Sequence, residues 1–395
     1  MKYILLFVAL CCFACTGGKY AGVPEKYHVL LDKAFEKAGN NAVELEKALK
    51  DAPENQKEGM AFLIAYMPER DLQSLKADFL LENAAYAYQA REQFPWAKAI
   101  PDSIFLNEVL PYVSLNEKRE SWRKEFYERF SKYVAKCTNI FEAIDSVNRN
   151  IRDEVVVDYN TKREKPDQAP FESMRQHMAS CTGLSILLTD AFRAVGIPSR
   201  VAGTPNWHDE RGNHNWTEVW ADGKWYFTEY YFPGQLDNAW FFADAGQAVK
   251  NNPDKAIYAS SFKPTGISFP LVWDENIRYV YAENVTDRYT DLYQKHYSAI
   301  AKDGDHVALR VTAFKDKKHD KQSEDRVATN LDVFHGKLQM GGGRTAGPTQ
   351  DMNDVLTFML KKNQTYTVNY VSATGMKSVE VKLKEKTKEL KLYME

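Results

Sequence analysis

Residues 180–229 read SCTGLSILLTDAFRAVGIPSRVAGTPNWHDERGNHNWTEVWADGKWYFTE. After Cys181, apolar residues recur at spacings of three and four, which predicts a helix with one buried face. The residues that carry this pattern are Leu184, Leu187, Leu188, Ala191, Phe192 and Val195. Gly196, followed by Pro198, is typical of the residues just beyond a helix end. The pattern therefore places Cys181 in the first turn of a core helix.

Two properties of a helix start make Cys181 a candidate nucleophile. The first turn carries a partial positive charge, which lowers the pKa of a thiol placed there and favours the thiolate. Its backbone N–H groups also have no acceptor within the helix, so the N–H of Cys181 can donate to a developing oxyanion. The alternative is a buried, inert cysteine, which is the more usual state of a single cysteine.

A β-hairpin follows the helix. Residues 214–220 and 225–231 are strand-like, and the Asp222-Gly223 pair between them is a typical two-residue turn. This turn pairs Ala221 with Lys224. The resulting register makes His214 and Glu229 diagonal neighbours on one face, with α-carbons about 7–8 Å apart. Side chains of that length can close a hydrogen bond across the gap.

A thiol, an imidazole and a carboxylate, in that order along the chain, are the groups of a nucleophilic cysteine enzyme. We therefore predict Cys181, His214 and Glu229 as catalytic residues. The carboxylate would orient the imidazole, and the other imidazole nitrogen would face the thiol. Considered alone, His214 would be interpreted as an ordinary surface or core histidine, and Glu229 as a solvated residue at a strand end. The combination of all three residues is what favours a catalytic site.

Weaker candidates lie nearby. Gln176, five residues before the cysteine, is a candidate second oxyanion donor, and Trp207 and Trp216 are candidate walls of a substrate cleft. A solvated glutamine and packed tryptophans are the structural alternatives. The His208-Asp209-Glu210 run matches no standard metal spacing, so we expect neither a metal nor another cofactor.

Several stretches of this region together resemble the transglutaminase-like superfamily, namely CTGLS at 181–185, AFRAVGIPSR at 191–200, HNWTEVW at 214–220, and 225–229. That superfamily includes animal transglutaminases, bacterial cysteine peptidases and peptide N-glycanases on a papain-like core. The resemblance implies Cys181 as nucleophile, His214 as base and the residue at 229 as the acid. The family usually has aspartate followed by proline at the last position, whereas this chain has Glu229 followed by Tyr230.

The amino-terminal segment resembles an export signal. A short basic start precedes an apolar run at 4–12, which is too short to span a bilayer. Ala14 directly precedes Cys15, and a glycine-rich stretch follows, as in the lipobox of bacterial lipoproteins. We therefore predict residues 1–20 as a signal peptide with lipobox and tether, with lipidation at Cys15. The protein would then be exported and lipid-anchored to a bacterial membrane, on its periplasmic side or at the cell surface. A plain secretory signal is the alternative.

The chain has five cysteines, at positions 11, 12, 15, 137 and 181. Processing and lipidation would leave Cys137 and Cys181 as thiols. Cys137 lies in an amphipathic helical pattern and is predicted as a small buried residue. A disulfide between the two is the alternative, because exported proteins often form one, and it would make the site structural.

The composition sets the class of protein. A chain of 395 residues is long enough for two or three domains. Its 44% hydrophobic and 27% charged residues are typical of a soluble globular protein. The 52 basic and 54 acidic residues give a net charge of −2, which provides no field for nucleic acid. We expect a peptide, glycopeptide or protein substrate and no nucleic-acid partner.

The predicted fold class is α+β, in three parts after the signal. Residues 21–150 carry helical periodicity, including long helices at 71–92 and 116–137, and form a helical region. Residues 151–302 form the transglutaminase-like core. In 303–395, alternating apolar residues predict a β-sandwich of about six or seven strands, which weakly resembles prealbumin-like modules.

These features predict an exported, lipid-anchored cysteine amide hydrolase or acyltransferase that acts on peptide, glycopeptide or carboxamide substrates. How well the cleft admits water decides whether water or an amine resolves the thioester. A non-catalytic lipoprotein that binds peptide or glycan on the same scaffold is the alternative. The presence of Glu229 in place of the usual aspartate favours that alternative.

Overall fold

The computed structural model describes residues 19–208, 210, 212–234, 236–239, 241–298, 305–336 and 338–395. The predicted lipidation site, Cys15, lies outside the described residues, with most of the predicted signal segment. The chain separates into two compact units, Met1–Leu81 and Glu82–Glu395. Within the described ranges, no helix is long and apolar enough to cross a membrane.

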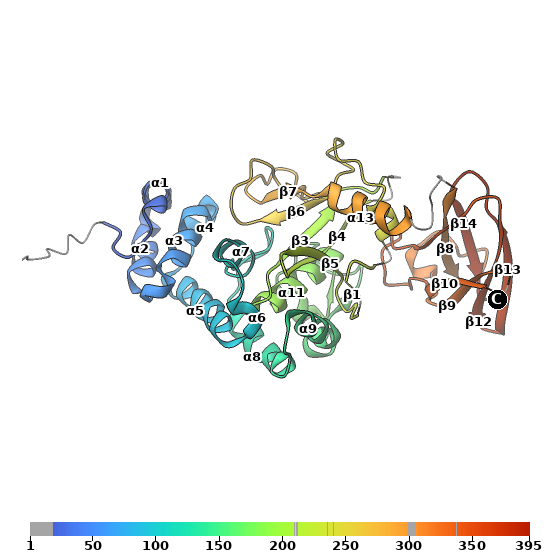
Figure 1. Cartoon of the computed structure of the whole chain (residues 1–395), viewed down its shortest axis with the longest axis horizontal. Helices are drawn as coiled ribbons and strands as arrows, with labels where there is room; N and C mark the ends of the chain where they lie inside the picture. The colour runs from blue at the N-terminus through green and yellow to red at the C-terminus, as the bar shows by residue number, and fades with distance from the viewer. Residues whose placement is uncertain are drawn as a thin grey trace, which may run out of the picture. The chain divides into compact units, whose positions relative to one another are not determined.

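The described part of the first unit is helical (Figure 1). Its elements are η1 (Glu25–Tyr27), α1 (His28–Ala38), η2 (Gly39–Asn41), α2 (Ala42–Asp51), η3 (Glu54–Gln56), α3 (Lys57–Tyr66), α4 (Glu69–Leu72) and the start of α5 (Ala77–Gln93). The single helix predicted at 71–92 is wrong, because the chain turns between α4 and α5. The buried amide of Asn41 accounts for the turn, since it donates to the carbonyls of Leu72 and Leu75 at 2.9 and 2.8 Å.

The second unit begins with helices that support the site: α6 (Pro95–Lys98), α7 (Asp102–Glu108), α8 (Trp122–Val134) and α9 (Ile140–Val155). The helix predicted to begin at residue 116 begins only at Trp122. The Glu117 carboxylate explains the late start, because it accepts the backbone N–H groups of Ser114 and Leu115 at 2.6 and 2.8 Å. The buried Arg123 guanidinium also donates to the carbonyls of residues 109, 110 and 111, which holds this segment in a non-helical path.

A five-stranded antiparallel sheet forms the centre of the unit, in the order β5-β4-β3-β6-β7. The strands are β3 (Ser199–Thr204), β4 (His214–Ala221), β5 (Lys224–Thr228), β6 (Tyr258–Ser261) and β7 (Tyr281–Asn284). Ala221 pairs with Lys224 and Thr217 with Thr228, so the predicted hairpin register is confirmed. The turn residues Asp222 and Gly223 both have positive φ, as this type of hairpin turn requires.

The predicted core helix is α11 (Cys181–Ala194), and it does begin at Cys181. It is preceded by β1 (Asp158–Tyr159), α10 (Pro170–Gln176) and β2 (Met178–Ala179). The sequence predicted one buried face, whereas every residue from 182 to 194 is buried. The reason is that α11 packs against β3 and β4 as well as against α8 and α9 (Figure 1). Its polar residues are accommodated by hydrogen bonds, such as those from Arg193 to the carbonyls of Glu108, Val113 and Ser199.

An aromatic core packs around β4 and β5 together with α12 (Phe242–Ala245) and α13 (Thr286–Ser298). Trp216 stacks on Phe241 with ring centroids 4.4 Å apart, and its indole N–H donates to the hydroxyl of Tyr289 at 2.6 Å. Because β4 alternates, His214 and Glu218 share the face of Trp216. The neighbouring Asn215 turns toward α11 instead, where its amide donates to the Thr182 hydroxyl at 2.7 Å.

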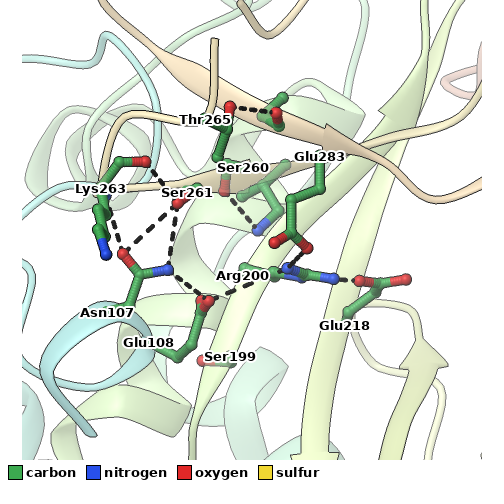
Figure 2. A network of polar contacts seen from close by, with 12 residues as sticks. Asn107, Glu108, Ser199, Arg200, Glu218, Ser260, Ser261, Lys263, Thr265 and Glu283 are labelled. Carbon is green, nitrogen blue, oxygen red and sulfur yellow. Dashed lines mark hydrogen bonds and ion pairs between the residues drawn. The ribbon is translucent and has the colours of Figure 1, made fainter. Parts of the chain in front are cut away.

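A buried polar network fixes the other end of β4. Figure 2 shows Arg200 of β3 between Glu218 and Glu283, with contacts of 2.9 and 2.8 Å. Glu108 of α7 lies 3.9 Å from the same guanidinium. Arg288 and the Tyr289 hydroxyl complete the contacts of Glu218. The strand that begins at His214 is therefore tied to β3, β7, α7 and α13.

The carboxyl-terminal strands form two sheets around one apolar core, with orders β10-β9-β12-β13 and β11-β8-β14. The elements are β8 (His306–Phe314), η4 (Ser323–Asp325), β9 (Asn330–His335), β10 (Leu338–Arg344), β11 (Leu356–Lys361), β12 (Thr365–Ser372), β13 (Gly375–Lys382) and β14 (Lys388–Tyr393). The alternating residues Val307, Leu309, Val311 and Ala313 of β8 all lie in this core. The predicted α+β class with carboxyl-terminal strands is confirmed.

Candidate active site

The first turn of α11 holds Cys181. The Ser180 hydroxyl caps the helix by accepting the N–H of Gly183 at 3.1 Å, and it donates to the carbonyl of Pro166 at 2.6 Å. Gly183 is also needed for close packing, because a Cβ there would lie 3.0 Å from the Ala179 Cβ. The half-buried Cys181 thiol is thus presented from a rigid turn.

The imidazole of His214 lies between the thiol and the carboxylate. Its Nε2 is 2.7 Å from Oε1 of Glu229, which follows directly after the end of β5. The imidazole and the Cys181 thiol line the same cavity, and each shifts the pKa of the other. Since Nε2 faces Glu229, Nδ1 is the nitrogen left for the thiol. The structure therefore brings together the three residues that the hairpin register and the helix start predicted.

The electrostatics of the site favour a thiolate–imidazolium pair. Burial alone would raise the pKa of Cys181, but the hydrogen bond and charge of His214, together with the N–H of Asn215, lower it below its usual value. Burial likewise opposes the imidazolium, but hydrogen bonds to Cys181 and Glu229 raise the pKa of His214 to about 10. Each charge of the pair stabilises the other, so the two groups titrate together.

Aromatic rings fix the orientation of the imidazole. The centroids of Trp207, Trp216 and Phe241 lie 6.0, 5.8 and 5.2 Å from that of His214. Both tryptophans are buried and neither lines the cavity that contains Cys181. The prediction of Trp207 and Trp216 as walls of a substrate cleft is therefore corrected to a packing role behind the histidine.

Gln176 does not reach the site. Its side chain accepts the backbone N–H of Glu164 at 3.1 Å and donates to the carboxylate of the same residue at 3.0 Å. It lies at the last residue of α10, and the His177 that follows has positive φ, so the chain turns away before it reaches the thiol. The structure places Gln176 in a local contact with Glu164, outside the residues that line the cavity.

Two supports of the triad were missed by sequence reasoning. The buried Asn148 of α9 donates to the carbonyl of Glu229 at 2.8 Å and to the Thr228 hydroxyl at 3.0 Å, and it accepts the N–H of Phe232 at 2.7 Å. It thereby fixes the chain on both sides of Glu229. The second support is the Asn215 N–H, whose hydrogen bond favours the Cys181 thiolate. An asparagine on the buried face of the α9 pattern was the one available signal, because a buried amide needs partners.

A cavity of about 330 Å³ opens over the triad. Core residues Tyr159 and Asn215 line it beside Cys181, His214 and Glu229. The segment between β10 and β11 contributes one wall, with Gln350, Asp351, Asn353 and Asp354. Sequence reasoning missed this wall, because more than a hundred residues separate it from the triad and no local pattern links the two.

Cys137 takes no part in the site. Its thiol contacts the carbonyl of Tyr133 at 3.9 Å and is half-buried rather than fully buried as predicted. Cys137 and Cys181 are both free, so the alternative of a disulfide between them is wrong. Within the described residues, no group of three or more histidine, cysteine or acidic side chains could hold a metal ion.

Comparison with known families agrees with this geometry. The model of the transglutaminase-like superfamily matches residues 128–230, a range that contains all three triad residues. This region of the chain, residues 128–230, is thus similar to the transglutaminase-like superfamily. No curated protein matches the sequence significantly.

Solved structures show more distant similarity. A candidate cysteine protease from Cytophaga hutchinsonii is 16% identical with a TM-score of 0.27, over 37% of this chain and 47% of that chain. A candidate protease from Parabacteroides distasonis is 14% identical with a TM-score of 0.23, over 47% and 30%. The transglutaminase of red sea bream is 10% identical with a TM-score of 0.27, over 66% and 58%. This chain thus covers less than two thirds of the length of each of these structures. At these scores the comparison rests on the family match and on the geometry of the site.

Proposed function

We propose that this chain is a cysteine amide hydrolase or acyltransferase that works through Cys181, His214 and Glu229. The observation that carries the proposal is the position of the His214 imidazole, which lies 2.7 Å from the Glu229 carboxylate and lines the same cavity as Cys181. Raised imidazole pKa and lowered thiol pKa are the properties that an activated cysteine requires.

The reaction follows from the positions of these groups. The Cys181 thiolate attacks the carbonyl carbon of an amide, and the N–H groups at the start of α11 lie where the oxyanion develops. His214 then donates its proton to the leaving amine, the C–N bond breaks and a thioester forms. Water or a second amine attacks the thioester with His214 as base, which releases the acid or a new amide and restores the thiol.

A second candidate, a non-catalytic binding protein, was motivated by glutamate in place of the usual aspartate. In this site the longer side chain still brings its carboxylate to 2.7 Å from the imidazole. That contact favours a catalytic triad over a non-catalytic binding site. Export and lipidation at Cys15 belong to the same proposal and rest on the sequence of the amino-terminal segment. Mass spectrometry of the protein expressed in a bacterium would detect an acylated Cys15.

The test is turnover of a complex peptide pool that includes glutamine-containing peptides and glycopeptides. The wild-type protein should produce new termini, hydrolysed carboxamides or, with a dansylated alkylamine present, amine adducts, all read by mass spectrometry. Cys181→Ala should abolish every product, because no other group forms the thioester. Cys137→Ala is the matched control, and it should retain activity.

A labelling experiment with iodoacetamide separates catalysis from binding without a known substrate. Cys181 should alkylate faster below neutral pH than a free cysteine, since its thiolate is stabilised. The proposal fails if products persist in Cys181→Ala, or if Cys181 stays inert to alkylation in a folded protein.

A further inference from the structure

The segment at 347–354 brings the carboxyl-terminal sandwich into the cleft. Asp351 and Asp354 belong to this segment, directly before β11, and they line the same cavity as Cys181. The contact of the sandwich with the site therefore consists of specific side chains. The sandwich is therefore a candidate for binding the substrate as well as for supporting the fold.

Contacts on both sides hold the segment in place. The buried Arg326, 1% exposed, donates to the carbonyl of Asp351 at 2.7 Å and to that of Asp354. On the core side, the Tyr159 hydroxyl donates to the Asp351 carboxylate at 3.0 Å, and the Asn353 amide donates to the carbonyl of Asn213 at 2.7 Å. Asn213 directly precedes His214, so the segment is tied to the strand that carries the catalytic base.

Acidic side chains outnumber basic ones among the residues that line the cavity. Arg152 pairs with Asp158 at 2.7 Å, and His214 pairs with Glu229 at 2.7 Å. Asp351 accepts the Tyr159 hydroxyl, but no residue within the described ranges hydrogen-bonds the carboxylate of Asp354. Burial, with the charges of Glu229 and Asp351 adding to it, raises the pKa of Asp354 to about 6. At neutral pH the Asp354 carboxylate thus lies near Arg326 and His214, which attract it, and near Glu229 and Asp351, which repel it. A substrate cation would relieve the repulsion among these carboxylates.

Asp354 also borders two neighbouring cavities. A second cavity of about 520 Å³ adjoins the first, and Gln350 and Asp354 line both. Phe232, Phe242 and Phe358 contribute to the walls of this second space. Asp354 therefore borders both the cavity of Cys181 and the space next to it.

We propose that Asp354 is a specificity-determining residue that binds a positively charged primary amino group of the substrate, as in a lysine-type side chain or a free amino terminus. The inference rests on the proposed function, because it assigns a preference to the reaction of Cys181. It makes the carboxyl-terminal sandwich part of the substrate site.

Charged thiol reagents test the inference without a known substrate. A methanethiosulfonate reacts when the thiolate attacks its sulfenyl sulfur, which forms a mixed disulfide and releases methanesulfinate. The trimethylammonioethyl reagent carries a positive charge and the methyl reagent carries none. Rates at Cys181 are read from the adduct on its own peptide by mass spectrometry under non-reducing conditions. The ratio of cationic to neutral rates, divided by the same ratio for a free cysteine peptide, measures the preference of the cleft.

The wild-type protein should prefer the cationic reagent by about 5-fold to 10-fold, the size expected for one nearby charge in a partly solvated cleft. Asp354→Asn should remove most of this preference and leave the neutral rate within about two-fold. Asp354→Glu should keep it, since the charge remains. Glu324→Gln is the control for net charge, because it removes a carboxylate from an exposed residue elsewhere in the sandwich, and it should change nothing.

The pH dependence of the ratio provides an independent arm. The charged groups that face Asp354 are Glu229, Arg326, His214 and Asp351. Because Asp354 becomes charged as the pH rises through about 6, the wild-type preference should grow across this window. In Asp354→Asn the ratio should stay flat.

The possible results separate this inference from the proposed function. A preference unchanged in Asp354→Asn overturns the inference. So does an equal loss of both rates, because Asp354 would then act through the imidazole rather than on the reagent. A folded wild-type protein whose Cys181 reacts with neither reagent would overturn the proposed function and the inference with it.

Discussion

Glu229 directly follows the end of β5, and its carboxylate lies 2.7 Å from the imidazole Nε2 of His214. The strand pairing ends at Thr228, so Glu229 lies just beyond the paired residues of the hairpin. Asn148 fixes the main chain at this position through the Glu229 carbonyl. Side-chain length and backbone position are therefore matched to each other.

The first prediction concerns that match. Glu229→Asp should lower the alkylation rate of Cys181 near neutral pH by about 10-fold or more, although aspartate is the usual residue of the family, because a lost charged hydrogen bond costs about 1.5–3 kcal/mol. Glu229→Gln should have an effect of similar size. Iodoacetamide labelling with mass spectrometry checks both variants. An aspartate variant as reactive as wild type would show that the backbone can move to close the gap.

The second prediction concerns the pH profile of the thiol. In His214→Ala, the alkylation rate of Cys181 should begin to rise only at higher pH than in wild type, because burial raises the thiol pKa once the imidazolium is gone. In wild type the imidazolium persists until the pH approaches 10, so the thiolate should remain paired throughout the neutral range. The exposed His335 provides the control, and His335→Ala should leave the profile unchanged.

The third prediction concerns Asn148. Its replacement by alanine leaves the Glu229 carbonyl and the Phe232 N–H without their buried partner, so it should destabilise the protein by about 1–3 kcal/mol in urea unfolding. It should also lower the alkylation rate of Cys181, because Glu229 is no longer fixed. Asn150→Ala, on the same helix but away from the site, should cost less than about 1 kcal/mol and leave the rate unchanged. Equal effects of the two variants would count against a positioning role.

The fourth prediction concerns the polar network of Figure 2. Burial raises the pKa of Glu108 from 4.5 to about 7, despite the nearby Arg200 and Arg193. The folded state therefore binds more protons than the unfolded state between these pH values, and this group's contribution to stability falls as the pH rises through the window. Compared with wild type, Glu108→Gln should gain up to about 3 kcal/mol in relative stability from pH 4.5 to pH 7. Urea unfolding across this range checks it, and parallel profiles would contradict the prediction.

The local features of the site could be predicted from the sequence. The Asp222-Gly223 turn sets the hairpin register by itself, and the apolar spacing of α11 with its Ser180 cap sets the start at Cys181. Both depend on residues close together in the chain, where backbone geometry leaves few choices. For the same reason, the alternation of apolar and polar residues was enough to predict the strands of the sandwich.

Features that depend on distant side chains could not be predicted. Helical periodicity continues through the segment before α8, but the side chains of Glu117 and Arg123 bind its backbone groups and hold it in a non-helical path. The acidic wall needs Arg326 and Tyr159 to hold the Asp351 segment, and neither leaves a pattern in the sequence. Gln176 was misplaced because its distance from Cys181 along the chain says nothing about the turn at His177.

The two halves of the cleft are made at different times during synthesis. All three triad residues have been translated once Glu229 has been added, whereas β8, β11 and β14, which form the sheet beside the wall segment, follow much later in the chain. The middle strand of this sheet pairs on one side with β14, which is among the last strands to be translated. A chain that ends before β11 would therefore carry the three triad residues without the sheet that flanks the acidic wall. The residues proposed to select the substrate would then be in place only after the sandwich is complete, later than the residues proposed to carry out the reaction.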